Sequence, residues 1–277
     1  EIQMKNFVRR EARYFSITVL LALLCLPVAA QQPAAAQQPA DNEYMAGAVL
    51  WTQLSGEKRA LSYQAFALAR LMLDRDLRVN RKRRVKRAVI VDIDETILDN
   101  SRYQTMLLKT RTNYASKTWT EWVNKAQATA LPGAVEFLRY ANSRGVLVFY
   151  ITNRKEIEKE GTARNLKQAG FPNVNDETLL VRTDSSVKEP RRRAVAAKYR
   201  VVLLMGDNLN DFAEVFENSK TVESRVAATD QNRNLFGARF IVLPNPMYGN
   251  WEDAIYGDPA KLTEEEKAAK RKAALKD

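Results

Sequence analysis

The stretch Ala88-Val-Ile-Val-Asp92-Ile-Asp94-Glu-Thr96 predicts the fold. It begins with an apolar, β-branched run, which is typical of a strand buried on both faces of a sheet. Two aspartates follow at once, and residues i and i+2 of a strand point to the same side. Because ligands of open α/β sheets bind beyond the carboxyl ends of the strands, Asp92 and Asp94 can both face one ligand.

Two neighbouring carboxylates repel each other unless a cation or a shared proton relieves the repulsion. Hard oxygen ligands of this kind suit Mg²⁺, so the pair is a candidate magnesium site. The alternative is that Asp92 and Asp94 merely end a strand and begin a turn, where aspartate is common. The rest of the chain decides between the two interpretations.

The composition favours one sizeable globular domain with appendages and excludes several kinds of active site. The chain has 277 residues, of which 45% are hydrophobic and 28% are charged. It contains no histidine, so these residues cannot build a histidine-nucleophile phosphatase, a Ser-His-Asp hydrolase, a His-ligated zinc site or a His-ligated haem. The single cysteine, Cys25, lies in the N-terminal segment, and a mature protein without that segment has no disulfide.

The formal net charge is +11, and much of the excess lies in the run Arg78–Arg87. Such a run can bind nucleic acid or a membrane surface, or attract anionic substrates over long range. No aromatic residues interleave with it, as a single-strand-binding surface would require. We interpret it as a solvated link into the first strand and expect no nucleic-acid partner.

The first 30 residues predict export. Basic residues come first, an apolar core follows over Ile17–Leu26, and Val28-Ala-Ala30 provides a small-residue cleavage site. The core is too short to span a bilayer comfortably. We predict a signal peptide over residues 1–30 and, from the Gln-, Pro- and Ala-rich composition that follows, a disordered linker over residues 31–45. The mature protein would be periplasmic or secreted.

Further apolar runs predict strands that alternate with helices. The predicted strands cover residues 145–152, 178–182, 200–206 and 239–243, and helices are predicted at 134–143 and 155–169. This alternation predicts an α/β fold with a mainly parallel sheet and helices on both faces. Polar residues end three of the strands, namely Asp92 with Asp94, Thr152, and Asp207 with Asp211. Three such strand ends at one edge of a sheet are much harder to explain as turns than one.

The main domain is predicted over residues 46–260, with cap elements near 46–75 and 101–130. The first is helical over Ala46–Leu73, with Ser55 as an N-cap. In the second, Thr118-Trp-Thr-Glu121 fits a capping box and would place Trp119 on the first turn of a helix. An insertion after the first strand lies at the carboxyl edge of the sheet, where a cap over a site belongs. Residues 261–277 predict a charged helix or tail.

The motifs resemble a known family in type and order. Asp92-Ile-Asp-Glu-Thr-Ile-Leu-Asp-Asn-Ser101 is similar to the first motif of the haloacid dehalogenase-like (HAD-like) phosphatases, in the form of the class C acid phosphatases, the bacterial lipoprotein 5'-nucleotidase branch. Phe149-Tyr-Ile-Thr-Asn-Arg154 resembles their second motif, and Gly206-Asp-Asn-Leu-Asn-Asp211 their fourth. The resemblance implies a Rossmann-like fold with a small, mostly helical cap.

The resemblance also implies an acid phosphatase mechanism. Asp92 would attack phosphorus to form an aspartyl-phosphate, and Asp94 would act as general acid and then general base. Thr152 would donate to a phosphoryl oxygen. Mg²⁺ would be held by Asp92, the backbone carbonyl of Asp94 and Asp207, with Asp211 supporting the metal ligands.

Lys188 matches the third motif, the lysine that offsets phosphoryl charge. The family pattern usually has another lysine before the serines, and Thr183-Asp-Ser-Ser186 has none. Arg182 or Arg191 would serve the same electrostatic purpose, although Lys188 is the best match.

The substrate class depends on aromatic residues. The segment Pro244-Asn-Pro-Met-Tyr248-Gly-Asn-Trp251 resembles the class C segment that helps bind the nucleoside. Tyr248 and Trp251, with Trp119 from the insertion, would enclose a base, and Asn153 is a further candidate for substrate binding. The alternative is that these aromatic residues pack the cap.

The sequence therefore predicts a magnesium-dependent phosphomonoesterase that acts on nucleoside 5'-monophosphates and other small phosphate esters. A broad phosphomonoesterase without nucleotide preference, a phosphotransferase, and a basic nucleic-acid or surface-binding protein with a vestigial site are the alternatives. By resemblance we expect a homodimer. Relatives are often lipoproteins whose lipidated cysteine follows a small residue, but Leu24 precedes Cys25, so a membrane anchor is not expected and an outer-membrane lipoprotein is the less favoured location.

Overall fold

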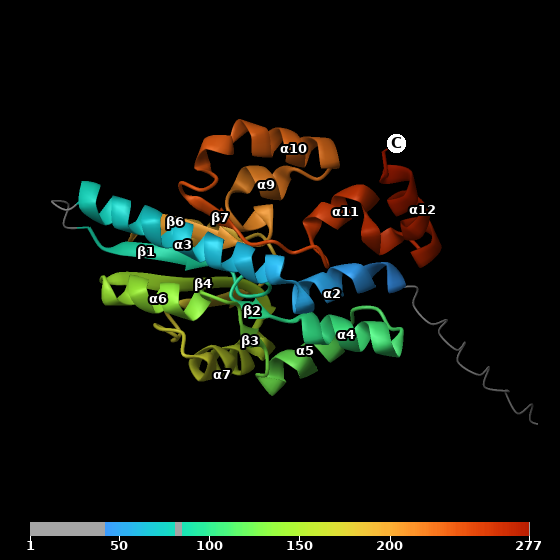
Figure 1. Ribbon diagram of the computed structural model, residues 1–277, viewed down its shortest axis with the longest axis horizontal. Helices are drawn as coiled ribbons and strands as arrows, with labels where there is room; N and C mark the ends of the chain where they lie inside the picture. The colour runs from blue at the N-terminus through green and yellow to red at the C-terminus, as the bar shows by residue number, and fades with distance from the viewer. Residues whose placement is uncertain (1–41, 81–84, 277) are drawn as a thin grey trace, which may run out of the picture. The chain divides into compact units, whose positions relative to one another are not determined.

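A five-stranded parallel sheet forms the centre of the computed structural model (Figure 1). Its order is β5 (Leu179–Arg182), β4 (Val146–Lys155), β1 (Arg87–Val91), β6 (Arg200–Gly206) and β7 (Phe240–Val242), and all four pairings are parallel. This confirms the predicted α/β fold with its mainly parallel sheet. The structure describes residues 42–80 and 85–276, within a unit that begins at Pro39. The predicted signal peptide, residues 31–41 of the predicted linker and Arg81–Arg84 of the basic run lie outside the described residues.

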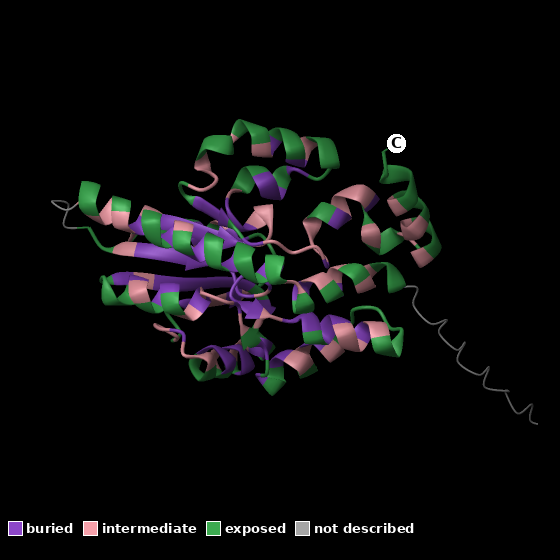
Figure 2. Ribbon diagram, viewed as in Figure 1, coloured by how far each residue is buried: buried purple, intermediate pink, exposed green. Residues whose placement is uncertain are grey.

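The central strand is β1, and it is buried on both faces, as predicted. Val89 and Val91 belong to one hydrophobic core, whereas Ala88 and Ile90 belong to a second core on the other face. Helices α3 (Gly56–Val79), α6 (Ala134–Ser143) and α7 (Lys159–Ala169) contribute to the first core, and α8 (Glu189–Ala196), α9 (Glu214–Asn218) and α10 (Val222–Gln231) to the second. The buried strands lie between these two layers (Figure 2).

The segment before β1 contains two helices in place of the single predicted one. Helix α2 (Ala46–Leu54) ends at Ser55, whose extended backbone separates it from α3. The Ser55 side chain accepts a hydrogen bond from the Lys58 backbone N–H at 3.0 Å, so the predicted N-cap is confirmed. Residues 43–45, predicted as disordered linker, instead form the 3₁₀ helix η1 (Glu43–Met45). The Asn42 side chain fixes this segment by donating to the Leu107 and Thr112 carbonyls, each at 3.0 Å.

The insertion after β1 forms a helical pair framed by a short antiparallel ribbon. Helices α4 (Ser101–Thr110) and α5 (Ser116–Lys125) lie between β2 (Leu98–Asp99) and β3 (Thr129–Ala130), which pair with each other. The predicted capping box at Thr118 is wrong, because α5 begins at Ser116. Thr118 lies inside the first turn, where its hydroxyl donates to the Ala115 carbonyl at 3.0 Å.

The chain after the sheet continues in two helices that pack together. Helix α11 (Asn250–Tyr256) is followed by η5 (Pro259–Lys261) and by α12 (Glu264–Ala274), so most of the predicted charged helix or tail is a helix. Thr263 and Glu266 form the capping box of α12. The remaining 3₁₀ helices are η2 (Glu156–Glu158), η3 (Leu209–Asp211) and η4 (Arg233–Leu235). Within the described ranges 42–80 and 85–276, no helix combines the length and apolarity needed to cross a membrane.

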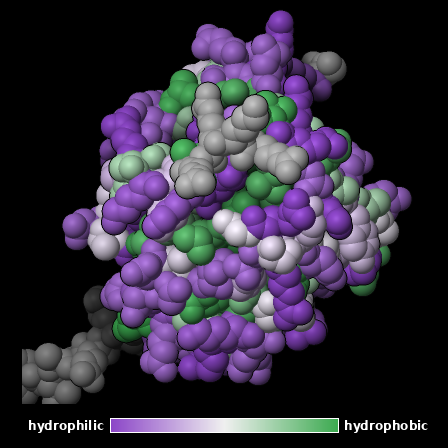
Figure 3. Space-filling view, turned by 90° about the vertical axis from the view of Figure 1, so that its left-hand side faces the viewer, coloured by the Kyte–Doolittle hydropathy of each residue, from purple (hydrophilic) through white to green (hydrophobic). Residues whose placement is uncertain are grey.

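The amino ends of the strands form an edge with many exposed cations. Lys86, Arg144, Lys198 and Arg239 are all exposed beside the starts of β1, β4, β6 and β7. This face of the molecule is largely hydrophilic (Figure 3). Part of the net positive charge therefore gathers at the edge opposite to the acidic strand ends.

Gly161 allows α7 to pack closely against α5. A Cβ at this position would lie 2.9 Å from the Val123 carbonyl oxygen and from the Asn124 Cα, which are backbone atoms. We expect Gly161→Ala to lower the free energy of unfolding by about 2 kcal/mol in urea titrations, because overpacking forces the helices apart. Gly47→Ala is the matched control: its Cβ would meet no described atom within 4 Å. An equal loss in both variants would contradict the packing argument.

Candidate active site

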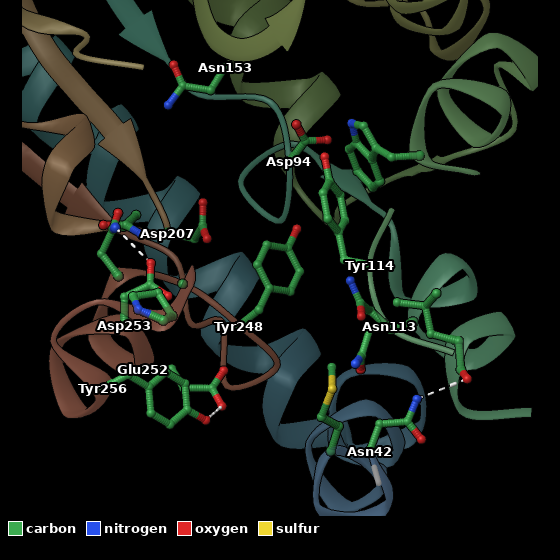
Figure 4. A pocket seen from close by; sticks show the side chains of 18 of the residues that line it. Asn42, Asp94, Asn113, Tyr114, Asn153, Asp207, Tyr248, Glu252, Asp253 and Tyr256 are labelled. Atoms are coloured by element: carbon green, nitrogen blue, oxygen red, sulfur yellow. Dashed lines mark hydrogen bonds between the residues drawn. The ribbon is translucent and has the colours of Figure 1, made fainter. Parts of the chain in front are cut away.

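The carboxyl ends of β1, β4 and β6 open into one cavity of about 640 Å³ (Figure 4). The side chains that line it at these ends are Asp92, Asp94, Asn153, Arg154 and Asp207. Lys188 and Asp211 line the same cavity. The structure thus brings together the acidic residues that the sequence places far apart.

Lys188 joins two of the predicted carboxylates. Its ammonium group forms an ion pair with Asp92 and donates to Asp211 Oδ1 at 2.6 Å, and all three side chains are buried. Burial opposes the positive charge of Lys188, but Asp211 and Asp92 outweigh this effect and raise its pKa. The structure therefore places Lys188 beside Asp92. Arg191 contacts the neighbouring strand end, where it donates to the Thr152 carbonyl at 2.5 Å.

Asp92 and Asp207 are carboxylates in a poorly solvated site. Burial raises the pKa of Asp92 well above its usual range, Lys188 opposes the shift, and Asp211 adds to it. Burial, followed by the charge of Asp211, raises the pKa of Asp207 to about 7. The Asp207 carboxylate accepts from Thr96 Oγ1 and from Asn245 Nδ2, each at 2.9 Å. Both oxygens of Asp207 are therefore held in a fixed direction.

The described carboxylates at this position fit a divalent cation. One oxygen from each of Asp92, Asp207 and Asp211 lies within 4.8 Å of the others. Buried carboxylates with raised pKa values are stabilised in their ionised form by a nearby cation, and oxygen is the ligand that Mg²⁺ prefers. The Asp94 carboxylate is not part of this group. Its predicted contribution is a backbone carbonyl, which remains a prediction.

Asp94 is instead held by Arg154 and Asn100. The Arg154 guanidinium, which is 2% exposed, donates from Nη2 to Asp94 Oδ1 at 2.7 Å and from Nε to both carboxylate oxygens. Asn100 Nδ2 donates to the same carboxylate at 2.8 Å, and Trp122 Nε1 fixes Asn100 by donating to its Oδ1 at 2.9 Å. Arg154 is a site residue that the sequence motifs did not predict. Its position two residues after Thr152 on β4 was the available signal, because i and i+2 share a side.

Thr152 and Asn153 differ in their access to the cavity. Thr152 is fully buried, its hydroxyl accepts from the Arg154 backbone N–H at 3.1 Å, and it does not line the cavity. Asn153 lines the cavity, and Arg191 Nη2 donates to its Oδ1 at 2.8 Å. The Thr152 hydroxyl thus lies beneath the surface of the cavity. Its predicted role as a hydrogen-bond donor to phosphate remains a prediction.

The loop before α11 connects the acidic cluster to α3 and to the first motif. Lys58 Nζ donates to the Pro244 carbonyl at 2.7 Å, and Asn245 holds Asp207. The Tyr248 hydroxyl donates to Glu95, a buried residue with a left-handed backbone (φ 56°) directly after Asp94. Burial, together with Asp94 and Asp207, raises the pKa of Glu95. Tyr248 is therefore fixed within the cavity by the first motif.

The structure only partly brings together the predicted aromatic residues. Tyr248 and Trp119 line the cavity, but Trp251, which is 45% exposed, lies in a smaller neighbouring cavity of about 290 Å³ beside α10. The two cavities meet at Asp207 and Asn208, and the predicted enclosure of a base by Tyr248, Trp251 and Trp119 remains a prediction. Trp119 is also a packing residue, since its ring lies 5.1 Å from that of Tyr103 in the small core of the cap. Tyr114, which was not predicted, lines the cavity beside Tyr248 (Figure 4).

Comparisons with known proteins agree with this fold and site. Residues 17–251 match the model of the HAD superfamily, subfamily IIIB (acid phosphatase). The crystal structure of the class C acid phosphatase from Bacillus anthracis with tungstate bound is 40% identical, covers 85% of this chain and 98% of that chain, and superimposes with a TM-score of 0.81.

More distant plant proteins are also similar. The stem 28 kDa glycoprotein of Glycine max is 26% identical over 181 residues, and acid phosphatase 1 of Solanum lycopersicum is 26% identical over 167 residues. These matches cover 62% and 57% of this chain and 65% and 57% of the two relatives, so the chain spans about three fifths of their length.

A parallel α/β sheet with carboxylates and a lysine at its carboxyl edge defines a HAD-type phosphatase site. The chain belongs to the class C acid phosphatases of the HAD superfamily, a family of phosphomonoesterases. The resemblance inferred from the sequence motifs is thereby confirmed.

Proposed function

We propose that this protein is a metal-dependent acid phosphatase that hydrolyses nucleoside 5'-monophosphates and other small phosphate esters through an aspartyl-phosphate. The observation that carries the proposal is the buried Asp92 at the end of the central strand, in contact with Lys188 and grouped with Asp207 and Asp211. Tungstate, an oxyanion with a shape similar to phosphate, is bound in a relative that is 40% identical.

The proposed chemistry uses one carboxylate as nucleophile and a second for proton transfer. The Asp92 carboxylate attacks phosphorus, and the bond between phosphorus and the ester oxygen breaks. Asp94, held by Arg154 and Asn100, gives its proton to the departing oxygen. Asp94 then takes a proton from a water molecule that attacks the aspartyl-phosphate, which releases phosphate and restores Asp92.

The remaining charges of the site support this transfer. Lys188 offsets negative charge on Asp92 and on the phosphoryl group. Asp92, the Asp94 carbonyl and Asp207 would hold a divalent cation, Mg²⁺ by preference, which supplies positive charge opposite the phosphate. Thr96 and Asn245 keep the Asp207 carboxylate oriented for that purpose.

The nucleotide preference rests on the aromatic lining of the cavity. The rings of Tyr114 and Tyr248 lie in the same cavity as Asp92, and an aromatic base stacks on such rings. We also propose export, from the order of basic, apolar and small residues over 1–30. We propose a homodimer from the likeness to the family.

The test is phosphate release from adenosine 5'-monophosphate and from glycerol phosphate by the purified protein. We expect release to stop after treatment with a chelator and to return with Mg²⁺. We expect kcat/KM for the nucleotide to exceed that for glycerol phosphate by about tenfold or more, which is the effect of one stacked base. Equal values for both esters would reject the nucleotide preference. Activity that survives complete metal removal would reject the metal dependence. The absence of phosphate release at every pH and with every metal tested would reject the phosphatase function.

A further inference from the structure

The last two helices complete the catalytic cavity although they extend beyond the family model, which ends at residue 251. Tyr256 of α11, Pro259 of η5, and Glu264 and Lys267 of α12 all line the same cavity as Asp92. Helices α11 and α12 lie together beyond the carboxyl edge of the sheet (Figure 1). The wall that they form is therefore not part of the common phosphatase motifs.

Arg271 attaches α12 to α11 and to η1. Its guanidinium carbon lies 3.6 Å from the centre of the Tyr44 ring, and its Nη1 donates to the Tyr256 hydroxyl at 2.7 Å. The Tyr256 hydroxyl in turn donates to Glu252 at 2.5 Å. Tyr44 and Tyr256 both line the cavity and come from opposite ends of the described chain. One cation therefore holds two tyrosines of the cavity wall in place.

The wall and the reacting groups line different parts of the same cavity. In Figure 4 the Tyr248 ring lies between Asp94 and the pair formed by Tyr256 and Glu252. A phosphate bound at Asp92 would extend its organic group past Tyr248 before that group reached α12. The part of α12 that lines the cavity is polar: Lys267 and Glu264 form an ion pair at 2.9 Å.

We propose that α12 is the element that selects the leaving group of the substrate, with Lys267 as a contact residue and Arg271 as the positioning residue. The proposal rests on the proposed phosphatase function and deepens it. Esters with a large, polar or aromatic organic group gain contacts with α12, whereas small alkyl phosphates end before it. Selectivity for large esters over small ones therefore depends on the attachment of α12 by Arg271.

The test compares kcat and KM for three esters: glycerol phosphate, 1-naphthyl phosphate and adenosine 5'-monophosphate. We expect Arg271→Ala to lower the ratio of kcat/KM between each large ester and glycerol phosphate by about tenfold, mainly through KM, because a cation–π contact and a charged hydrogen bond are lost. Arg271→Lys should restore much of the ratio, since an ammonium group can keep both contacts. Lys272→Ala is the matched control, because Lys272 is exposed on the same helix and should leave the ratio within about twofold of the wild type.

Two outcomes overturn the proposal: an unchanged ratio in Arg271→Ala, or an equal loss for small and large esters. If Arg271→Ala does not fold, Lys267→Ala decides, because it alters the wall and leaves Arg271 in place, and it must lower the same ratio. A failure of the nucleotide preference can be distinguished from a failure of the α12 proposal, because 1-naphthyl phosphate still measures the effect of α12. If the wild type hydrolyses no ester, the phosphatase proposal fails, and calorimetric binding of adenosine 5'-monophosphate to Lys267→Ala must still be weaker than to the wild type.

Discussion

Replacement of Asp92 by asparagine is expected to lower kcat for every phosphate ester by roughly four to six orders of magnitude, the effect of removing a nucleophile. Asparagine has the same shape as aspartate, so the variant should fold. Its amide does not attack phosphorus. Acid quenching during turnover should trap phosphate on the wild-type chain and none on Asp92→Asn. The measurement is phosphate release together with circular dichroism of both proteins.

The matched control is Asp99→Asn in the same motif. The Asp99 side chain accepts from the Ser101 backbone N–H at 2.8 Å and does not line the cavity. Asparagine can accept the same hydrogen bond, so we expect activity within about threefold of the wild type. Substantial activity in Asp92→Asn would show that another group attacks phosphorus and would remove the basis of the proposed mechanism.

Gly206→Ala is expected to produce the second largest effect, a loss of about 100-fold or more in kcat/KM, because small displacements of catalytic groups have effects of this size. A Cβ on Gly206 would lie 2.6 Å from the Asp211 Cγ. Asp211 has little freedom to move away, since its Oδ2 accepts from the Asn208 backbone N–H at 3.0 Å and its Oδ1 contacts Lys188. The clash therefore displaces both Asp211 and the lysine beside Asp92.

A second glycine variant separates this effect from a general cost of adding a methyl group. Gly56→Ala introduces a Cβ that would meet no described atom within 4 Å, and we expect its kcat/KM to equal that of the wild type. Steady-state kinetics and urea unfolding of both variants provide the comparison. Full activity in Gly206→Ala would mean that Asp211 can move without consequence for the site.

Much of the fold follows from local sequence patterns. The run Ala88–Val91 alternates between two cores, so its uninterrupted apolar character is the pattern of a central parallel strand. In a parallel sheet all carboxyl ends lie at one edge, which is why Asp92, Asn153 and Asp207 could be assigned to one site before their contacts were known.

The parts that could not be predicted depend on how segments turn and meet. Tyr248 and Trp251 are close in sequence, but Gly249 has a φ of 145° and α11 begins at the next residue. The chain therefore changes direction between the two rings, and they line different cavities. The pairing of Asp94, which follows β1, with Arg154 on β4 spans 60 residues, so the position of Arg154 on its strand marks it as a candidate for the site but does not identify its partner.

The proposed nucleophile, Asp92, directly follows β1, and this position affects which parts of the protein unfold first. Strand β1 is hydrogen-bonded to β4 on one side and to β6 on the other, and its last four side chains are buried. Backbone amides of such a strand exchange with solvent only when the whole domain opens. Helix α12 contributes no buried residue along its described length and belongs with the segments that open locally. The proposed nucleophile thus adjoins the most persistent part of the protein, whereas the proposed contact with the substrate's organic group lies on a helix held mainly by surface contacts such as those of Arg271.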